Sequence, residues 1–399
     1  MDQPTAKSGF RQLNADDVEL GQPLRWSLHN DQGQLLLARG SVVRTENQRN
    51  RLLSQRVLVP LSPDEIAARR GAAAIPADDI NRTYRQKGVD VFGWLDAHYE
   101  LLATSYGLLG EGPSTDAVAG IRRLAVALQK AAEQNSEGLL AAVFLCREDR
   151  SYALGKAFHV ALFCNALARV SGVNAETRLS LIAAGLTHDV AMWQMQDQIQ
   201  LREAPLSDAQ WSVIRAHCAA GVELLKQSGV RDPIWLTAVG QHHERLNGSG
   251  YHLGITDAQI EPVARIMAIA DVFAAMVRIR GDRDKRVPKE AMRQIFMTRG
   301  DEIDSTLVQL FIKKIGMFAP GCMLRLVNGE IGVATGASSN AASPDVAVII
   351  DSNNQPLARS VYRDTASRGF AVQEFVSEVD HPQLQELLAT WWNPVPITL

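Results

Sequence analysis

The sequence predicts a mainly α-helical protein, in which a helical bundle is flanked by small β-rich modules on its N- and C-terminal sides. From residue 89 to residue 318, apolar residues recur at three- and four-residue spacing, the period of an amphipathic helix. On both sides of this stretch, short apolar segments flank turn clusters instead. Hydrophobic residues make up 46% of the 399 residues and charged residues 21%, a balance that supports a large core.

The first two segments of the chain are predicted to differ in structure. Residues 1–62 are assigned to a β-rich N-terminal module, because the apolar segments Leu24–Leu28 and Leu35–Ala38 flank the turn cluster 30–33, which is typical of a hairpin. Residues 63–87 are assigned to a linker, since prolines, a glycine and several alanines interrupt any apolar pattern there. The N-terminal module carries no recognisable ligand motif, and its place in the domain order favours regulation, dimerisation or a protein partner.

Residues 88–149 are predicted to form a helical segment that leads into the bundle. Their first helix has an apolar stripe made of Val91, Trp94, Leu95, Leu101 and Leu102. In the simplest interpretation this stripe is core, and in the alternative it is the face of a homodimer.

The following helices are expected to build the central domain, assigned to residues 150–318. In chain order, helices are expected over 114–135, 137–147, 152–170, 175–190, 207–228, 232–245, 260–279, 288–298 and 304–314. Gly172, Gly229 and Gly300 stand where helices are expected to end.

Residues 319–399 are predicted to form a β-rich C-terminal extension. The segments Cys322–Val327 and Ile331–Thr335 bracket Asn328-Gly329, a strong hairpin signal. Two more strands are expected at Val346–Asp351 and Leu357–Tyr362, followed by a closing helix over Gln383–Trp392.

Composition and charge exclude several classes of function. A net charge of −3 and a pI near 6.3 are not those of a sequence-independent nucleic-acid binder, so no nucleic-acid polymer is expected as a partner. The longest apolar run, Leu139–Cys146, is far too short for a membrane helix, and no membrane is expected as a partner. The four cysteines form no C-x-x-C pair and the N-terminus has no apolar secretory core, so a cytoplasmic location is expected.

Histidines and aspartates concentrate in the central domain. A lone histidine in a helix is most simply a core or surface residue, but this set includes acidic residues inside apolar segments, where an unpaired charge is costly. Side chains from separate helices can converge on one point of a bundle. The set consists of His159, His188, Asp189, His217, His242, His243 and Asp271.

These residue types predict a centre with two metal ions. Imidazole mixed with carboxylate suits divalent transition metals, iron or manganese first, with zinc, nickel or magnesium as alternatives. Seven groups are too many for one tetrahedral ion but fit two octahedral ions bridged by a carboxylate. Paired ions of this kind are used for phosphate ester hydrolysis, because they lower the pKa of a shared water and bind phosphoryl oxygens.

The same residues carry a family resemblance. His188-Asp189 is the doublet that names the HD superfamily, and the segment from His242 to His252 (HHERLNGSGYH) resembles the HHE-x-x-DG-x-GYP signature of the HD-GYP family. Residues 206–225, 262–276 and 329–333 resemble the same family, so the resemblance covers roughly residues 150–335. It implies an HD-domain helical bundle that cleaves cyclic di-GMP.

The resemblance also implies roles for individual residues. It assigns His159, His188, Asp189 and Asp271 to one ion and His217, His242 and His243 to the other, with Asp189 as the bridge. It makes Asp189 and His188 the catalytic pair. It places the substrate-binding residues at Arg280, Arg283, Arg245, Gly250 and Tyr251. Arginine suits phosphate because its planar fork binds two oxygens at once.

The sequence departs from the family signature at four positions. Met192 replaces the lysine of the HD-x-GK motif, and Asn247 replaces the aspartate of the DG pair. His252 replaces the proline of GYP. Gly155 stands where some members have a glutamate for a third metal, so a third ion is not expected.

These observations predict a metal-dependent phosphodiesterase. In this hypothesis a hydroxide bridging the two ions opens cyclic di-GMP to pGpG or carries it on to GMP, in bacterial second-messenger signalling. The alternative is a catalytically weak or inactive HD-GYP-like module that senses a nucleotide or a metal. A third hypothesis keeps the enzyme and changes the substrate to another cyclic dinucleotide or phosphate ester.

Overall fold

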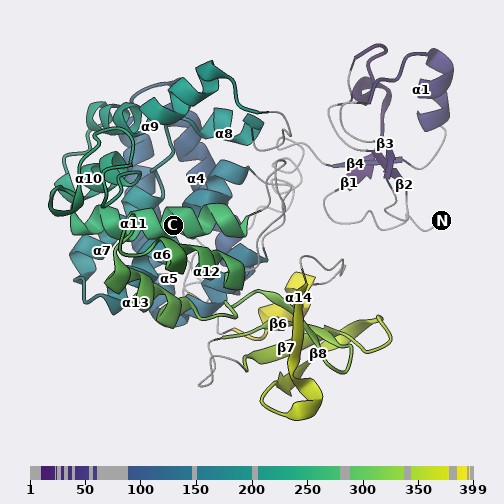
Figure 1. Cartoon of the computed structure of the whole chain (residues 1–399). Helices are drawn as coiled ribbons and strands as arrows, with labels where there is room; N and C mark the ends of the chain where they lie inside the picture. Colours follow the sequence, from purple (N-terminus) through teal and green to yellow (C-terminus); the bar gives the residue numbers. More distant parts are fainter. Residues whose placement is uncertain are drawn as a thin grey trace. The chain divides into compact units, whose positions relative to one another are not determined.

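The computed structural model describes residues 10–22, 24, 28–30, 35–37, 41–53, 57–60, 89–145, 151–199, 205–278, 288–336, 343–376, 384–392 and 395. The chain divides into two compact units, Met1–Arg82 and Thr83–Leu399. The first unit holds a small sheet and the second holds the helices and a second sheet (Figure 1). The predicted linker 63–87 lies outside the described residues.

The first unit is built around a four-stranded antiparallel sheet of order β1-β4-β2-β3. Its elements are β1 (Phe10–Gln12), η1 (Ala15–Asp17), β2 (Leu28–Asn30), β3 (Leu35–Leu37), α1 (Glu46–Leu53) and β4 (Val57–Pro60). β2 and β3 pair as the predicted hairpin, with Leu28 opposite Leu37. Helix α1 was not predicted, because its polar sequence (ENQRNRLL) has no apolar stripe. A small core of seven buried aliphatic residues, from Leu13 to Val59, holds this unit together.

The second unit is mainly helical, as predicted. Its helices are α4 (Val91–Glu111), α5 (Thr115–Phe144), α6 (Tyr152–Val170), α7 (Ala175–Gly185), α8 (Trp193–Ile199), α9 (Asp208–Gln227), α10 (Pro233–Gln241), α11 (Pro262–Val277), α12 (Pro288–Thr298) and α13 (Ser305–Ile315). The boundaries follow local chemistry. The Ser207 hydroxyl accepts from the backbone N–H of Gln210 in a capping box at the start of α9, and Asp232 caps α10 ahead of Pro233. Gly172, Gly229 and Gly300 follow α6, α9 and α12 with positive φ, as predicted.

Three helix predictions need correction. Helix α5 (Thr115–Phe144) joins the predicted helices 114–135 and 137–147 into one as far as Phe144, although Asn135 interrupts it with non-helical φ and ψ of −149° and 68°. Helix α8 was not predicted, since its short sequence WQMQDQI is too polar for an apolar stripe. The predicted helices 175–190 and 232–245 end early, at Gly185 and Gln241. The pairs His188-Asp189 and His242-His243, which follow these helices, therefore lie in turns.

Helix α6 lies at the centre of the bundle and packs against α5, α7, α11 and α13. Every residue from Tyr152 to Ala168 is buried, so this helix has no face toward solvent. Helix α7 approaches it so closely at Gly185 that a Cβ there would lie 2.8 Å from the Ala161 Cα. Only glycine fits this crossing, which brings the residues after Gly185 against α6.

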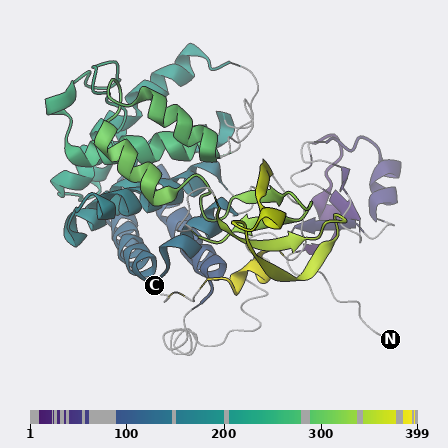
Figure 2. The same cartoon turned by 60° about the horizontal axis from the view of Figure 1, so that its bottom comes forward.

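The C-terminal sheet is antiparallel, with strand order β8-β7-β6-β5-β9 (Figure 2). Its elements are β5 (Met323–Leu326), β6 (Ile331–Ala334), β7 (Asp345–Ile350), β8 (Pro356–Asp364), η3 (Arg368–Phe370), β9 (Val372–Val376) and α14 (Leu384–Ala389). β5 and β6 form the predicted hairpin around Asn328-Gly329. β9 was not predicted, because apolar and polar residues do not alternate regularly along its short sequence, VQEFV.

The C-terminal segment is packed onto the helices. Ile331 and Val333 belong to the same hydrophobic core as the bundle. The Trp392 indole N–H donates to the Thr335 carbonyl, and its ring packs edge-on against Phe92 of α4. Val395 exchanges both backbone hydrogen bonds with Val89.

Among the described helices, none combines the length and the apolar character that crossing a membrane requires.

Candidate metal centre

The pairs His188-Asp189 and His242-His243 lie in two turns, one after α7 and one after α10. After α7, the Tyr106 hydroxyl donates to the Leu186 carbonyl, and the Trp235 indole N–H donates to the Thr187 hydroxyl. These contacts with residues far along the chain hold 186–192 as turns, where local apolar character alone predicts more helix. His188 and Asp189 are consequently buried beside α6, and His242 and His243 follow the end of α10 in the same way.

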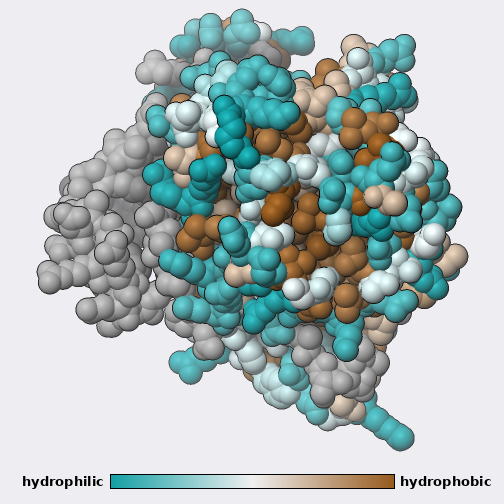
Figure 3. Space-filling model, turned by 90° about the vertical axis from the view of Figure 1, so that its left-hand side faces the viewer, coloured by the Kyte–Doolittle hydropathy of each residue, from teal (hydrophilic) through white to brown (hydrophobic). Residues whose placement is uncertain are grey.

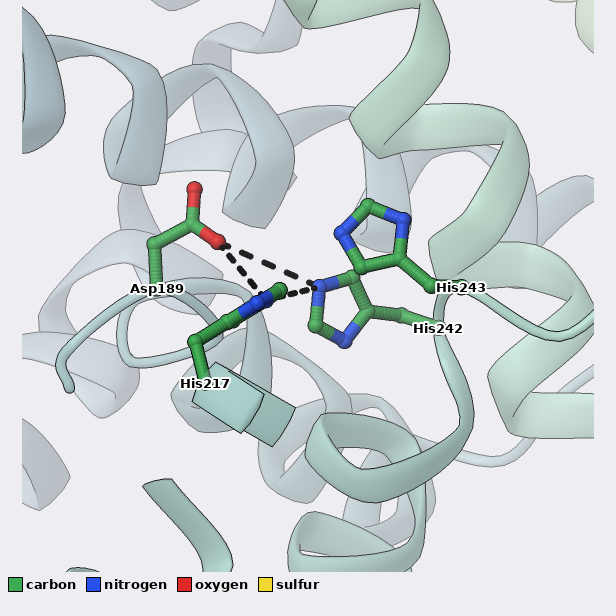
Figure 4. Close-up of side chains that lie close together, drawn as sticks. All are labelled: Asp189, His217, His242 and His243. Atoms are coloured by element: carbon green, nitrogen blue, oxygen red, sulfur yellow. Dashed lines mark hydrogen bonds and ion pairs between the residues drawn. The ribbon is translucent and has the colours of Figure 1, made fainter. Parts of the chain in front are cut away.

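One group of ligand atoms brings together Asp189, His217, His242 and His243, and we call it the three-histidine group. One ligand atom from each residue lies within 4.8 Å of all the others. His217 Nε2 is 3.3 Å from both His242 Nε2 and Asp189 Oδ1, and His242 Nε2 is 4.0 Å from the same oxygen. Figure 4 shows the Asp189, His217 and His242 side chains converging on one point, with the His243 ring next to that of His242.

Backbone carbonyls fix which nitrogen of each ring faces the centre. His217 Nδ1 lies 2.6 Å from the Ile214 carbonyl, His242 Nδ1 lies 2.8 Å from that of Val239, and His188 Nδ1 lies 2.9 Å from that of Gly185. A carbonyl can only accept, so each Nδ1 donates and each Nε2 is left as the ligand atom. This outer arrangement of hydrogen bonds is typical of histidines that bind metals.

The second group consists of Lys156, His188, Asp189 and Asp271, and we call it the lysine group. The atoms of His188, Asp189 and Asp271 also meet within 4.8 Å. His188 Nε2 is 2.9 Å from Asp189 Oδ2 and 3.4 Å from Asp271 Oδ1. Lys156 Nζ, however, lies 2.7 Å from each of these same two carboxylate oxygens. A positive charge from the chain therefore already stands where the sequence predicts an ion.

Charges in the cluster shift the pKa values of its members. Burial alone would lower the pKa of His188 and of His217, but Asp189 outweighs it and raises these pKa values to about 9 and about 10. Burial and then the charge of His217 lower the pKa of His242 to about 3. Burial would raise the pKa of both carboxyls, but His188 and Lys156 hold it well below the usual range. Both carboxylates are therefore ionised at neutral pH.

The loop after His243 is folded by two residues of the predicted signature. Glu244 is buried and its carboxylate accepts from the backbone N–H groups of Leu253 and Ile255, at 2.7 and 3.2 Å. A Cβ on Gly250 would lie 2.5 Å from the Glu244 Cα, so only glycine fits there. This close approach lets the Tyr251 ring stack on His243, with ring centroids 4.4 Å apart. Gly250 thus shapes the loop that brings Tyr251 to the centre.

The departure at the GYP proline has a backbone explanation. His252 has a φ of 98°, a value that proline, with φ locked near −65°, cannot adopt. Its side chain is exposed. The loop here therefore takes a conformation that excludes a Gly-Tyr-Pro sequence.

The remaining predicted residues lie elsewhere or outside the described residues. His159 is buried on α6 but belongs to neither group of ligand atoms, and its Nδ1 lies 3.1 Å from the Gly155 carbonyl. Arg245 donates to the Glu244 carbonyl at 2.9 Å and to the His242 carbonyl at 3.4 Å, so part of its guanidinium supports the turn. Arg280 and Arg283 lie outside the described residues.

Three residues at the centre were missed by sequence reasoning. Lys156 joins the two carboxylates, and the Gln196 amide donates to Asp189 Oδ2 at 2.8 Å. Arg278 lies 3.3 Å from His159 Nδ1 and fills the space beside Gly155, where a Cβ would meet its guanidinium at 2.7 Å. A signal for Lys156 was present, since it is a charge inside an apolar helix, as Asp271 is. Gln196 carries no such signal, whereas Arg278 begins the basic segment 278–286 from which Arg280 and Arg283 were selected as substrate-binding residues.

Apolar side chains also reach the surface of the helical domain. Trp211 and Val213 on α9 and Leu253 in the loop after His243 are exposed. Figure 3 shows apolar residues gathered in the middle of one face, with hydrophilic residues around them. Because α9 also carries His217, apolar surface and metal ligands come from the same elements.

Comparison with known proteins identifies the domain. Residues 130–307 match the HD domain family. This segment of the chain is similar to HD domains. This confirms the resemblance expected from His188-Asp189, and the helical fold with flanking β-rich parts agrees with it. Among solved structures, Bd1817, an HDG"Y"P protein from Bdellovibrio bacteriovorus, superposes with a TM-score of 0.52 and 16% identity, covering 76% of this chain and 98% of that one. At this identity the likeness concerns the fold of the HD domain and its flanks.

Two curated relatives match parts of this chain at higher identity. A cyclic di-GMP phosphodiesterase of Pseudomonas aeruginosa is 29% identical over 150 residues, which are 38% of this chain and 36% of that protein. A 3′3′-cGAMP-specific phosphodiesterase of Vibrio cholerae is 34% identical over 133 residues, which are 33% of this chain and 31% of that protein. The chain thus matches about a third of the length of these relatives.

The residues present fit a metal ion in the three-histidine group. Asp189 Oδ1 is buried, makes no hydrogen bond within the described residues and lies 3.3 Å from His217 Nε2, the ligand atom of that imidazole. It faces Nε2 atoms that the backbone has oriented for a ligand role. Three imidazoles with one carboxylate oxygen suit a divalent transition metal. The lysine group offers the same ligand types, but its two carboxylate oxygens already contact an ammonium.

Proposed function

We propose that the HD domain is a metal-dependent phosphodiesterase that hydrolyses cyclic di-GMP to pGpG, GMP or both, in bacterial second-messenger signalling. The observation that carries this proposal is the three-histidine group, in which Asp189 Oδ1 and oriented imidazole nitrogens face one point in a buried site. The activities after which the two relatives are named support a cyclic dinucleotide as the substrate class.

Individual residues have different roles in the proposed reaction. Hydrolysis joins a water oxygen to phosphorus and breaks the bond from phosphorus to the ribose oxygen, which takes up a proton. A bound divalent ion supplies Lewis acidity and lowers the pKa of water. Asp189 is the catalytic residue of the proposal, because its Oδ1 completes the metal site. His188, 2.9 Å from Asp189 Oδ2, positions that carboxylate.

Tyr251 is suited to the substrate. Burial and the charge of Asp271 raise the pKa of its phenol, so the hydroxyl keeps its proton and can donate a hydrogen bond to a phosphate or a leaving oxygen. Its ring is fixed by stacking on His243. The exposed Trp211 and Leu253 offer apolar surface for the purine bases.

Iron or manganese is the proposed metal, since the three-histidine group mixes imidazole with carboxylate and contains no thiolate ligand. Asp189 takes part in both groups and could bridge two ions if the lysine group also accepted one.

A second candidate function is a signalling module with little or no turnover, which binds a nucleotide or a metal. The observation that favours it is the lysine group, because an ammonium contacts the two carboxylate oxygens that are expected to bind one of the ions. The motif position of the family lysine is held by a buried methionine, Met192. The nucleotide would then be bound without being cleaved.

Metal analysis and turnover together test these alternatives. Protein purified without air is assayed for metal, then incubated with cyclic di-GMP and with 3′3′-cGAMP, each with and without Asp189→Asn. Metal-dependent hydrolysis that Asp189→Asn abolishes supports the phosphodiesterase, and the preferred substrate names its specificity. Tight calorimetric binding with no hydrolysis under any metal supports the signalling module. Protein that binds neither metal nor nucleotide overturns both.

A further inference from the structure

Lys156 lies in an unusual place for a lysine. It is on α6, three residues before His159, and only 5% of its surface is exposed. Its Nζ is 2.7 Å from Asp189 Oδ2 and 2.7 Å from Asp271 Oδ1. From helix α6, the Lys156 ammonium therefore bridges the Asp189 and Asp271 carboxylates, as a metal ion would.

The two oxygens of Asp189 face different partners. Oδ2 is surrounded by Lys156 Nζ at 2.7 Å, Gln196 Nε2 at 2.8 Å and His188 Nε2 at 2.9 Å. Oδ1 has no hydrogen-bond partner among the described residues and faces His217 Nε2 at 3.3 Å. The chain itself thus occupies the side of Asp189 toward the lysine group and leaves the side toward the three histidines for an ion.

An ion and the ammonium compete for the same space. A divalent ion bound to Asp189 Oδ2 and Asp271 Oδ1 would lie about 2 Å from each oxygen. It would have to occupy the space between the carboxylates that Nζ now fills, and it would be repelled by the ammonium charge. Binding there requires Lys156 to leave.

The surroundings of Lys156 oppose its departure. Helix α6 is buried from Tyr152 to Ala168, so a displaced Lys156 side chain would leave both carboxylates while still starting from a buried position. A buried charge that loses its partners is strongly destabilising. The lysine side chain is held where it is by both carboxylates.

We propose that the Lys156 ammonium replaces one of the two divalent ions, so that the HD domain binds a single ion, in the three-histidine group. The inference rests on the proposed function for the presence of that ion and specifies how the cluster is filled. The ammonium contributes one positive charge and holds Asp189 and Asp271 in place, but it offers no open coordination position for water or phosphate. Lys156 is a positioning residue in this arrangement.

Metal stoichiometry tests the proposal. The full chain is loaded with Mn²⁺, freed of excess metal and analysed by elemental mass spectrometry, beside Lys156→Met, which has an unbranched side chain one atom shorter and removes the charge. We expect one ion per chain in the wild type and two in Lys156→Met. Lys226→Met, which changes an exposed lysine on the same helix as His217, is the matched control and should bind one. The double variant Lys156→Met with Asp271→Asn should also bind one, because the second site has lost a ligand.

Electron paramagnetic resonance of the Mn²⁺-loaded wild type gives an answer even where Lys156→Met fails to fold. A single ion shows the hyperfine pattern of isolated Mn²⁺, whereas two ions sharing Asp189 show exchange coupling. Two coupled ions in the wild type, or one ion in folded Lys156→Met, would overturn the proposal and leave the phosphodiesterase function intact. A wild type that binds no ion would overturn the proposed metal-dependent function as well.

Discussion

Asp189 takes part in two groups of side chains that differ in the cation facing each of its oxygens. On the Oδ1 side, three imidazoles surround a buried oxygen that has no hydrogen-bond partner among the described residues. On the Oδ2 side, the chain supplies its own cation, Lys156. Both groups mix imidazole with carboxylate, so these ligand types alone do not show which of the two groups contains a cation of the chain. The difference teaches that a metal site is defined as much by the cations near it as by its ligands.

The largest expected effect is a difference in metal affinity between a variant that loses a histidine of the three-histidine group and one that loses the histidine of the lysine group. We expect His217→Ala to weaken metal binding by more than about 100-fold, because loss of a ligand should cost more than loss of an outer-shell partner. His188→Ala should retain the ion, since Lys156 and Gln196 still hold Asp189 Oδ2. Both are measured by Mn²⁺ titration, with His252→Asn, which changes an exposed histidine outside the cluster, as the control. Equal losses in the two alanine variants would mean that the groups do not differ as described.

A double-mutant cycle tests the lysine group without metal. In the presence of a chelator, Lys156→Met and Asp271→Asn should each lower the free energy of unfolding by about 3–5 kcal/mol, because each leaves a buried partner charge uncompensated. The double variant should be more stable than the sum of these losses predicts, since it removes both charges. Urea denaturation measures all four corners of the cycle. Additive losses would show that the 2.7 Å contact does not couple the two residues.

A smaller effect is expected from the loop that supports the three-histidine group. Gly250→Ala puts a Cβ 2.5 Å from the Glu244 Cα and 2.6 Å from the His243 carbonyl oxygen, so the backbone must move. The stacking of Tyr251 on His243 should then be lost, and metal affinity should fall about tenfold, as when an outer-shell support is removed. Gly107→Ala on α4, where no atom lies within 4 Å of the added Cβ, is the control and should have no effect. Unchanged metal affinity in Gly250→Ala would show that the conformation of this loop does not affect metal binding.

The smallest effect concerns pH. His217 has a pKa raised to about 10 in the absence of metal, whereas burial keeps His242 neutral, with a pKa of about 3. An ion at the three-histidine group must displace the proton of His217, so affinity should rise with pH from 7 toward 10, by about tenfold per unit. Calorimetry in buffers of different ionisation enthalpy counts the protons released. One proton per ion fits a single occupied group, and two would show that His188, whose pKa is raised to about 9, also gives up its proton to a metal.

Local chemistry in the sequence was enough to predict most of the fold. Helix α6 matches the predicted range 152–170, because the Ser151 hydroxyl caps its first turn and Gly172 follows its end. The early end of α7 could not be predicted, since it depends on Tyr106 and Trp235, which reach the turn from other helices. β9 and α8 were missed because their short, polar sequences carry no clear period.

The candidate site was predicted through its ligand types, and the structure brings six of the seven predicted metal ligands into two groups. The sequence did not show that His159 lies outside both groups. Its position on α6 directs the side chain toward Phe144, Phe163 and Arg278. Lys156, like Asp271, is a charge inside an apolar helix. Its pairing with Asp271 was not predicted, because an ammonium binds no metal and so has no place in a set of metal ligands.

The pairing of Val89 with Val395 has a consequence for the synthesis of the chain. Trp392 fits beside Gly138 on α5 so closely that a Cβ on that glycine would lie 2.7 Å from the Trp392 Cβ. The space between α4 and α5 that receives this indole is therefore complete only after residue 392 has left the ribosome, long after Gly138. Until then the nascent bundle presents an apolar gap to its surroundings, and we expect it to be a binding site for chaperones during translation.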